Sequence, residues 1–296
     1  MGLAHAAHGR GIKTLTMNRS LPVPYEQRLS ASDLEALRAA VAALERQSFA
    51  SRLTTAAGRQ FAHSPLLSPR IQSLASMAAQ KALQAALTVA LSSLEGAPRG
   101  DTTRMHRRLA AFTGAMGGAV GLASLPVELP LSTTIMLRSI ADIARNEGEN
   151  LRDPATALAC LEVFALDGHS SDDHFLEGGY LAIRSLLAKS VTDAARFMTT
   201  RGLAQQSAPA FVRLIGLLGA RFGIVVSQKA AAQAVPLIGA AAGAAINHAF
   251  AEHFQTLARG HFTMRRLERF YPPALVHAEY ARIAYAEGFW DRPSDS

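Results

Sequence analysis

Apolar residues recur every three to four positions along most of the chain, which is the spacing of one face of an α-helix. The first such run follows Ser32 and Glu35, which are spaced like a capping box, and Asp153 before Pro154 marks another helix start. Further helices are predicted over residues 69–94, 131–148, 154–166, 173–199, 244–271 and 273–287. No stretch alternates apolar and polar residues as a half-buried strand does. The pattern therefore predicts an all-α fold.

Two long, weakly charged segments interrupt this amphipathic pattern. In residues 109–137 the only formally charged side chain is Glu128, which lies between Pro126 and Pro130. The second segment, residues 208–251, carries no formal charge from position 230 onward and contains Pro236. Both segments contain glycines four positions apart, a spacing that lets another helix approach closely. These glycine pairs are 114/118, 117/121, 219/223 and 239/243.

We interpret each segment as a Gly-rich, proline-broken helical hairpin buried in one bundle, with a new helix starting near Leu131. Residues 109–127 approach the ~20 residues that cross a bilayer, but Ala and Gly dominate them and give little insertion energy. Insertion of 109–137 and 230–251 into a membrane stays open as the alternative. The predicted organisation is a disordered N-terminal segment (1–20), a single helical domain (21–287) and a disordered tail (288–296).

The composition of the chain indicates where in the cell the protein is located. Apolar residues make up 49% of the chain and charged residues only 18%, which indicates a large core or a membrane-facing surface. The net charge of +7 suits an anionic membrane surface, and no nucleic-acid recognition motif accompanies it. The first 20 residues contain no signal-peptide pattern, and the single Cys160 fits a reducing compartment. We therefore expect a cytoplasmic protein, peripheral on the inner face of the plasma membrane.

No complete catalytic or metal-binding motif is present. Residues 168–172 begin like the G-x-S-x-G nucleophile elbow, but Asp172 replaces the last glycine and the preceding residues are helical instead of a strand. His248 and His253 are five residues apart, about 140° around a helix, so their rings diverge and do not form a zinc site. Cys160 lies in an apolar helix and is expected in the core. We expect neither a metal nor a cofactor.

Glu128 is the polar residue that most needs an explanation, because burying a lone carboxylate is costly. Arg138 is the nearest cation after it, and Thr134, Arg138 and Asp142 follow at helical spacing on one face. One interpretation is a buried ion-pair network that fixes the proline-bent connection. The other is an acid or base with a raised pKa in an apolar pocket. That second interpretation makes a hydrolase, with candidate catalytic residues Glu128, Asp142, Asn247 and His253.

A basic and aromatic segment lies near the C-terminus. It combines Arg259, His261, Arg265, Arg266 and Arg269 with Phe262, Phe270 and Tyr271. Such a helix is typical of a cationic amphipathic surface resting on anionic lipid, and an ordinary solvated helix face is the alternative. The candidate binding residues are therefore Thr134, Arg138, Arg259 and Arg266.

Four long stretches of the chain resemble the EcsC family. They are LPVPYEQ (21–27), LPVELPLSTTIMLRSIADIARNEGENL (125–151), DPATALACLEVFALDG (153–168) and VPLIGAAAGAAINHAFAEHFQTLARGHFTMRRLERFY (235–271). With the helices between them, the resemblance covers most of residues 20–285. The family is named for a bacterial operon that encodes an ABC exporter, and its members are helical proteins without an agreed activity. The resemblance implies a bacterial, non-secreted, membrane-associated protein and carries over no catalytic residue.

Two functional hypotheses follow from these observations. The first is a non-enzymatic protein at the cytoplasmic membrane face that binds lipid or another apolar ligand, or that serves a membrane transporter. The second is a hydrolase, which requires Glu128, Asp142, Asn247 and His253 to meet around one cavity. A soluble scaffold without a ligand is the third and simplest alternative.

Overall fold

The computed structural model describes residues 28–45, 49, 69–94, 103–120, 125–167, 179–201, 209–233 and 240–290. These residues form nine α-helices and one short 3-10 helix, and none of them lies in a strand, so the all-α prediction is confirmed. The helices are α1 (Ala31–Leu44), α4 (Pro69–Leu94), α5 (Thr103–Val120), α6 (Leu125–Asn146), α7 (Pro154–Glu162), η3 (Val163–Ala165), α8 (Gly179–Arg201), α9 (Pro209–Gln233), α10 (Ala240–Phe270) and α11 (Pro273–Ala286).

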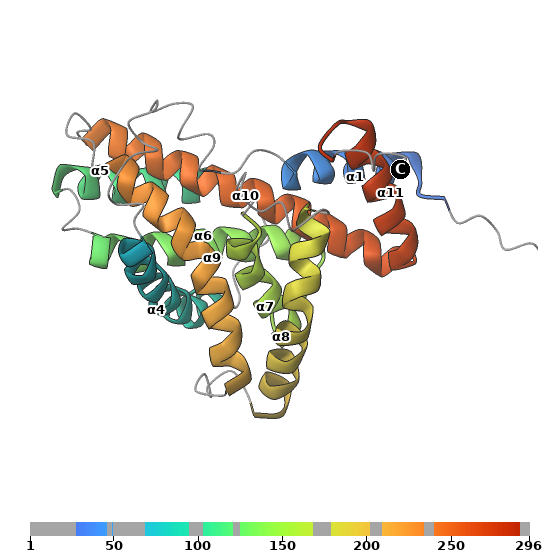
Figure 1. Ribbon diagram of the computed structural model, residues 1–296, viewed down its shortest axis with the longest axis horizontal. Coiled ribbons are helices and arrows are strands. Elements are labelled where there is room, and N and C mark those ends of the chain that lie inside the picture. The colour runs from blue at the N-terminus through green and yellow to red at the C-terminus, as the bar shows by residue number, and fades with distance from the viewer. Residues whose placement is uncertain are drawn as a thin grey trace, which may run out of the picture.

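The longest helix, α10, runs along the long axis of the molecule and connects its two ends (Figure 1). α5 packs beside it at one end, and α1 and α11 pack against it at the other. α6 contacts both α5 and α10, while α4 packs against α6 and α9. α7 and α8 complete the bundle on the side of α9. Segments far apart in sequence therefore share one core.

An aromatic cluster marks the centre of that core, where η3, α9 and α10 meet. The ring of Phe164 lies 4.8 Å from that of Phe222 and 5.1 Å from that of Phe254, measured between centroids. Phe250 lies 5.1 Å from Phe254 in an edge-to-face arrangement. Pairs in this range contribute about 0.5–1.5 kcal/mol beyond the area that they bury. These rings hold the middle of α10 against α9.

Two glycines allow α4 and α9 to pack with their backbones close together. A Cβ atom on Gly223 would lie only 2.5 Å from the Cα of Ser76, and one on Gly219 would lie 3.2 Å from the Cα of Gln80. Real Cβ atoms do not approach a backbone to 2.5 Å, so position 223 requires glycine. The close packing predicted for the pair 219/223 is confirmed. The surroundings of the pairs 114/118, 117/121 and 239/243 lie outside the described residues.

Helix starts follow the predicted capping chemistry, with one shift along the chain. α1 is capped by Ser30, whose Oγ accepts the backbone N–H of Asp33 at 3.1 Å, and not by Ser32 as predicted. The Ser30-x-x-Asp33 spacing offers the same kind of cap two residues earlier, which lengthens the helix. The start of α7 is as predicted, because Asp153 Oδ1 accepts the N–H of Ala155 at 3.0 Å.

The predicted break near Leu131 is wrong, because α6 begins at Leu125 and contains both prolines. Pro126 lies in the first turn, where backbone N–H groups have no partner within the helix, so proline is tolerated there. Pro130 removes one backbone bond, and Thr134 Oγ1 donates to the Pro130 carbonyl at 2.8 Å. Glu128 consequently lies in the first turn of a continuous helix.

One of the described helices, over residues 209–231, is long and apolar enough to cross a membrane. Of its most apolar window, 56% is buried within the protein, and core helices of soluble proteins pass the same test. α5 and α6, which cover most of residues 109–137, pack against α10 and each other. Leu109, Phe112 and Leu131 are nevertheless exposed, so the described part of the segment is only partly buried.

The folded part of the chain extends further toward the C-terminus than predicted. Trp290, which falls in the predicted tail, packs against Tyr280 at 5.8 Å and Tyr285 at 5.3 Å between ring centroids. Three residues assigned to the disordered tail are therefore ordered. The predicted N-terminal segment, 1–20, lies outside the described residues.

Candidate functional site

Glu128 is buried, as predicted, but its partner comes from another helix. Its Oε1 atom lies 2.7 Å from Nζ of Lys229 on α9, and the two side chains are 3% and 1% exposed. Nζ also lies 5.0 Å from the centre of the Phe250 ring, within reach of a cation–π interaction. Burial lowers the pKa of Lys229, and Glu128 opposes that shift. The predicted pairing with Arg138 is corrected to a pairing across 101 residues of sequence.

The described contacts of the predicted polar face of α6 do not join Thr134, Arg138 and Asp142 to one another. Asp142 accepts a hydrogen bond from Nη2 of Arg145, one turn along the same helix, at 2.6 Å. Thr134 bonds the carbonyl of Pro130. The Nε atom of Arg138 is buried, and no hydrogen-bond acceptor for it lies among the described residues. Each member of the face therefore has a separate environment.

Asn247 fastens α10 to α5. Its Nδ2 atom donates to the carbonyl of Ala110 at 2.9 Å and lies 3.3 Å from Oγ1 of Thr113. Since the bond to the carbonyl is buried, it satisfies a backbone group that would otherwise be costly to enclose. This contact gives Asn247 a packing role.

His253 is also buried, and it lies beside Asp167, two residues after the end of η3. Its Nε2 atom is 3.1 Å from Oδ2 of Asp167. The carboxylate of Asp167 accepts the backbone N–H of Phe49, at 3.4 Å from each oxygen. The imidazole packs between aromatic rings, 5.6 Å from Phe49 and 5.4 Å from Phe254.

The four candidate catalytic residues thus contact four different parts of the protein. Cys160 is fully buried, and burial raises the pKa of its thiol. The segment 168–172 lies outside the part of the chain that the structure places. No group of three potential metal ligands occurs among the described residues. The geometry gives the hydrolase hypothesis no support.

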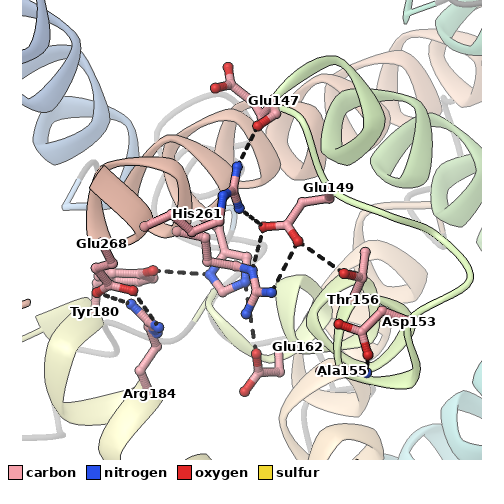
Figure 2. Close-up of polar contacts among 12 residues, drawn as sticks. Glu147, Glu149, Asp153, Ala155, Thr156, Glu162, Tyr180, Arg184, His261 and Glu268 are labelled. Carbon is pink, nitrogen blue, oxygen red and sulfur yellow. Dashed lines mark hydrogen bonds and ion pairs between the residues drawn. The ribbon is translucent and has the colours of Figure 1, made fainter. Parts of the chain in front are cut away.

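A buried polar cluster that the sequence did not reveal lies between α7, α8 and α10 (Figure 2). The hydroxyl of Tyr180 is 3.0 Å from Nδ1 of His261, and Nε2 of the same ring is 3.8 Å from Oε2 of Glu162. All three side chains are buried. Because the three residues come from three helices, their contacts fix how α7, α8 and α10 pack together.

Burial sets the charge state of this cluster. Burial lowers the pKa of His261 well below 6.5, and the positive charges of Arg184 and Arg265 add to that effect. Burial also raises the pKa of Glu162. The imidazole is therefore neutral in the folded protein at neutral pH. The three buried side chains therefore form a structural unit that joins α7, α8 and α10.

Acidification should destabilise the protein through His261. As the pH falls through 6.5, the imidazole takes up a proton in the unfolded chain, but the buried ring stays neutral in the folded protein. The unfolded state then binds more protons, so this group lowers the free energy of unfolding by at most about 1.4 kcal/mol per pH unit. Urea unfolding between about pH 7.5 and 5.5 measures the slope.

The matched control for this slope is His261→Gln, which can still bond Tyr180 but does not titrate. The raised pKa of Glu162 acts in the opposite direction, since the folded protein takes up that proton first as the pH falls. Glu162 is present in both proteins, so the difference between their slopes belongs to His261. Equal slopes in the two proteins would show that the ring is not buried in its neutral form.

The basic segment near the C-terminus is engaged in ion pairs within the protein. Arg266 contacts Glu147 at 2.9 Å and Asp33 at 3.1 Å. Arg265 bonds both oxygens of Glu149, at 2.9 and 3.2 Å. Arg269 also forms an ion pair with Glu149, and Arg259 lies 3.4 Å from the Thr103 hydroxyl, although both arginines are exposed. His261 and Phe262 are buried, whereas Phe270 is 74% exposed. Arg265, Arg266 and Arg269 therefore hold α1, α10 and the α6–α7 connection together through ion pairs.

The exposed side of α5 combines positive charges with large apolar side chains. Arg104, Met105, Arg108, Leu109 and Phe112 all lie on the exposed side of α5, and we call these five residues the α5 face. Met105 is 50% exposed, Leu109 45% and Phe112 65%. Their spacing places the large apolar side chains along one stripe with the two arginines beside it. No acidic residue occurs anywhere in α5.

The opposite side of α5 is fixed to α10 by polar contacts along its length. Besides the bonds of Asn247, the side-chain amide of Gln255 donates to the carbonyl of Thr103 at 3.0 Å. Arg107 lies 3.5 Å from Glu252. The backbone of α5 is thus held in place independently of its exposed residues.

The sequence did contain the signal for the α5 face. Residues 104–108 are mostly basic and the stretch from residue 109 is uncharged, so they look like two regions in the sequence. One helix, α5, covers both. A helical projection across that boundary puts the arginines and the apolar residues on the same side.

Comparison with known proteins gives one match. The model of the EcsC protein family matches residues 17–267, which is most of the chain. No curated protein matches the chain significantly. The solved structures likewise give no significant match.

Proposed function

We propose a function for this chain from one premise: it belongs to the EcsC protein family. In this proposal it is a non-enzymatic protein of the bacterial cytoplasm that associates peripherally with the inner face of the membrane. The α5 face makes the contact with anionic lipid. The observation that carries the proposal is the exposed stripe of Met105, Leu109 and Phe112 flanked by Arg104 and Arg108.

The chemistry of the α5 face matches the boundary between headgroups and acyl chains. Fully burying a Leu, Phe or Met side chain is worth about 1.5–3 kcal/mol, so three of them supply a useful part of a membrane affinity. Each arginine near an anionic surface adds about 1 kcal/mol. An apolar stripe with cations beside it and no acid is typical of interfacial helices.

The shape of the α5 face favours a lipid surface over a small apolar ligand. A helix side whose central Phe112 is 65% exposed is convex and encloses nothing. Small apolar ligands are bound in concave sites that cover most of their surface. Since α5 is already fixed to α10, it can meet an extended surface without rearrangement.

A charge placed at Phe112, the most exposed apolar residue of the stripe, should weaken membrane association. We expect Phe112→Glu to weaken binding to phosphatidylcholine vesicles that contain phosphatidylglycerol by about tenfold or more, because it removes apolar contact and adds repulsion. Co-sedimentation of the full chain with these vesicles measures the effect. The matched control is Leu186→Glu on α8, because Leu186 is 61% exposed and lies on a helix that does not pack against α5.

The arginines provide the second arm of this experiment. The double variant Arg104→Gln/Arg108→Gln should bind vesicles more weakly at low salt, and the difference from the wild type should shrink as the salt concentration rises. If Phe112→Glu and Leu186→Glu bind equally well, the α5 face does not contact the membrane. A wild-type chain that ignores anionic vesicles at low salt would contradict the proposal as a whole.

A further inference from the structure

α4 and α9 pack against each other in opposite directions. Gly223 packs against Ser76, and Gly219 packs against Gln80, so the residue numbers rise along one helix as they fall along the other. The two helices lie side by side in Figure 1. This packing fixes which side of each helix points to solvent.

The residue that follows each of these four contact residues is exposed. These following residues are Met77 and Lys81 on α4, and Ala220 and Ile224 on α9. Each lies about 100° further around its helix than the contact residue before it. Because the helices are antiparallel, the same rotation leads to the same side of the pair. The four side chains therefore share one surface.

This surface carries one exposed stripe from each helix, with members spaced four, three and four residues apart. On α4 the stripe is Arg70, Leu74, Met77 and Lys81, and on α9 it is Arg213, Leu217, Ala220 and Ile224. We call the two stripes together the α4–α9 face. The members of each stripe lie within about 60° of one another and cover about three turns. Leu74 is 60% exposed, Met77 55% and Ile224 46%, so the middle of the face is apolar and open to solvent.

Every charge on the α4–α9 face is positive, and neither helix contains an acid. Arg70 lies at one end of the face, and Lys81 and Arg213 lie toward the other, because Gly219 is opposite Gln80. None of the three cations forms an ion pair within the part of the chain that the structure places. A partner that matches this face carries negative charge on both sides of an apolar centre.

We propose that the α4–α9 face binds an acidic, amphipathic helix of a partner protein. A spacing of four, three and four residues is that of the a and d positions in helices that pack side by side. Two adjacent stripes with this spacing offer a third helix apolar contacts along about three turns, as in the recognition of amphipathic helices by other proteins. Acidic side chains of that helix pair with the cations toward the two ends of the face.

Two other occupants match the α4–α9 face less well. A second copy of the chain, placed face to face, would bring its cations against those of the first copy. Lipid interfaces favour large side chains such as Trp and Phe, and the α4–α9 face has no aromatic residue, unlike the α5 face with Phe112. Binding of a partner helix is independent of the proposed membrane contact, because it uses different helices.

Isothermal titration of the full chain with a synthetic acidic peptide tests the proposal. The peptide has about three heptads, with leucine at a and d, glutamate at e and g and helix-forming residues elsewhere, and its like charges oppose self-pairing. It should bind about tenfold or more tightly than the same peptide with lysine at e and g, because the face is positive. Equal affinities for the two peptides, or binding of neither, would overturn the proposal.

Substitutions on the face locate the binding site. Met77→Glu should weaken binding of the acidic peptide about tenfold or more, since it places a like charge in the apolar middle. Phe112→Glu makes the same change of charge on the α5 face and should bind the peptide as the wild type does. The double variant Lys81→Glu/Arg213→Glu should bind the lysine peptide more tightly than the wild type does, a gain that misfolding cannot produce. If Met77→Glu and Phe112→Glu bind the acidic peptide equally well, the α4–α9 face is not the site.

Two further measurements detect the other occupants. If Met77→Glu binds anionic vesicles as weakly as Phe112→Glu does, the α4–α9 face contacts lipid and the helix assignment is wrong. If the wild type sediments as a dimer without peptide and Met77→Glu as a monomer, the face covers a second copy, and the helix assignment is again wrong. If Phe112→Glu has no effect on vesicle binding, the proposed membrane contact falls, while the peptide titration still decides the α4–α9 face.

Discussion

Replacing Lys229 with methionine should cost the protein about 3–5 kcal/mol of unfolding free energy. The substitution keeps a long apolar side chain in the core but leaves the carboxylate of Glu128 buried without the ammonium that lies 2.7 Å away. Removing one member of a buried ion pair costs far more than removing both, because the remaining charge has lost its counter-charge and is shielded from water. Equilibrium unfolding in urea measures the loss.

The double variant Glu128→Leu/Lys229→Met is the decisive control. Replacing both members of a buried ion pair with apolar residues of similar size is often neutral or stabilising, so most of the lost stability should return. Lys189→Met on α8 replaces an exposed lysine and should change stability by less than about 0.5 kcal/mol. If the double variant is as unstable as Lys229→Met, the loss comes from packing around Lys229 and not from the charge on Glu128.

Two glycine-to-alanine substitutions in α9 should have opposite effects on stability. A Cβ at position 223 would lie 2.5 Å from the Cα of Ser76, so Gly223→Ala forces α4 and α9 apart and should cost about 1–3 kcal/mol. Nothing lies within 4 Å of a Cβ at position 216, so Gly216→Ala should stabilise by about 0.5–1 kcal/mol through helix propensity. Thermal and urea unfolding of both variants measure the difference.

The pair of substitutions contains its own control, since both change the same residue type in the same helix. A second check is Ser76→Gly in the Gly223→Ala background. Removing the α4 side chain relieves only part of the clash, because the backbone of Ser76 itself is in the way. If Gly223→Ala proves as stable as Gly216→Ala, α4 and α9 are further apart than the structure places them.

The helices could be predicted from sequence because their signals are local. Spacing of apolar residues and the Asp153-Pro154 start each depend on a few neighbouring positions, and they agree with the observed elements. The same local reasoning started the next helix near Leu131 instead of Leu125, because it treated proline as a break wherever it occurs. A proline in the second turn costs one backbone bond, which the packing of α6 against α4, α5 and α10 outweighs.

Side-chain partners could not be predicted, because they depend on how distant helices pack. Desolvation alone indicates that Glu128 needs a cation, but 101 residues separate it from Lys229, and Arg138 is closer in sequence. The arginines of α10 illustrate the reverse error. Their number suggested a free basic surface, whereas acids from α1 and the α6–α7 connection neutralise Arg265 and Arg266. Charge content therefore says little about a surface until the counter-charges are located.

The α5 face could have been predicted from the sequence. Its five residues lie within nine positions, and a helical projection brings them together without any knowledge of the fold. What the sequence could not supply is which side of α5 is buried. The bonds from Asn247 and Gln255 to backbone carbonyls of α5 settle that question.

The packing of α1 against α10 has a consequence for protein synthesis. α1 is among the first helices to leave the ribosome, but α10 begins at Ala240, roughly 200 residues later. At about 5–20 residues per second, the apolar side of α1 waits about 10–40 s for the surface that covers it. Leu37, Val41 and Leu44 are exposed during that interval and are available to chaperones or to a nearby membrane. A nascent chain that stops before α10 would leave α1 permanently uncovered, so the fold can close only after its longest helix is complete.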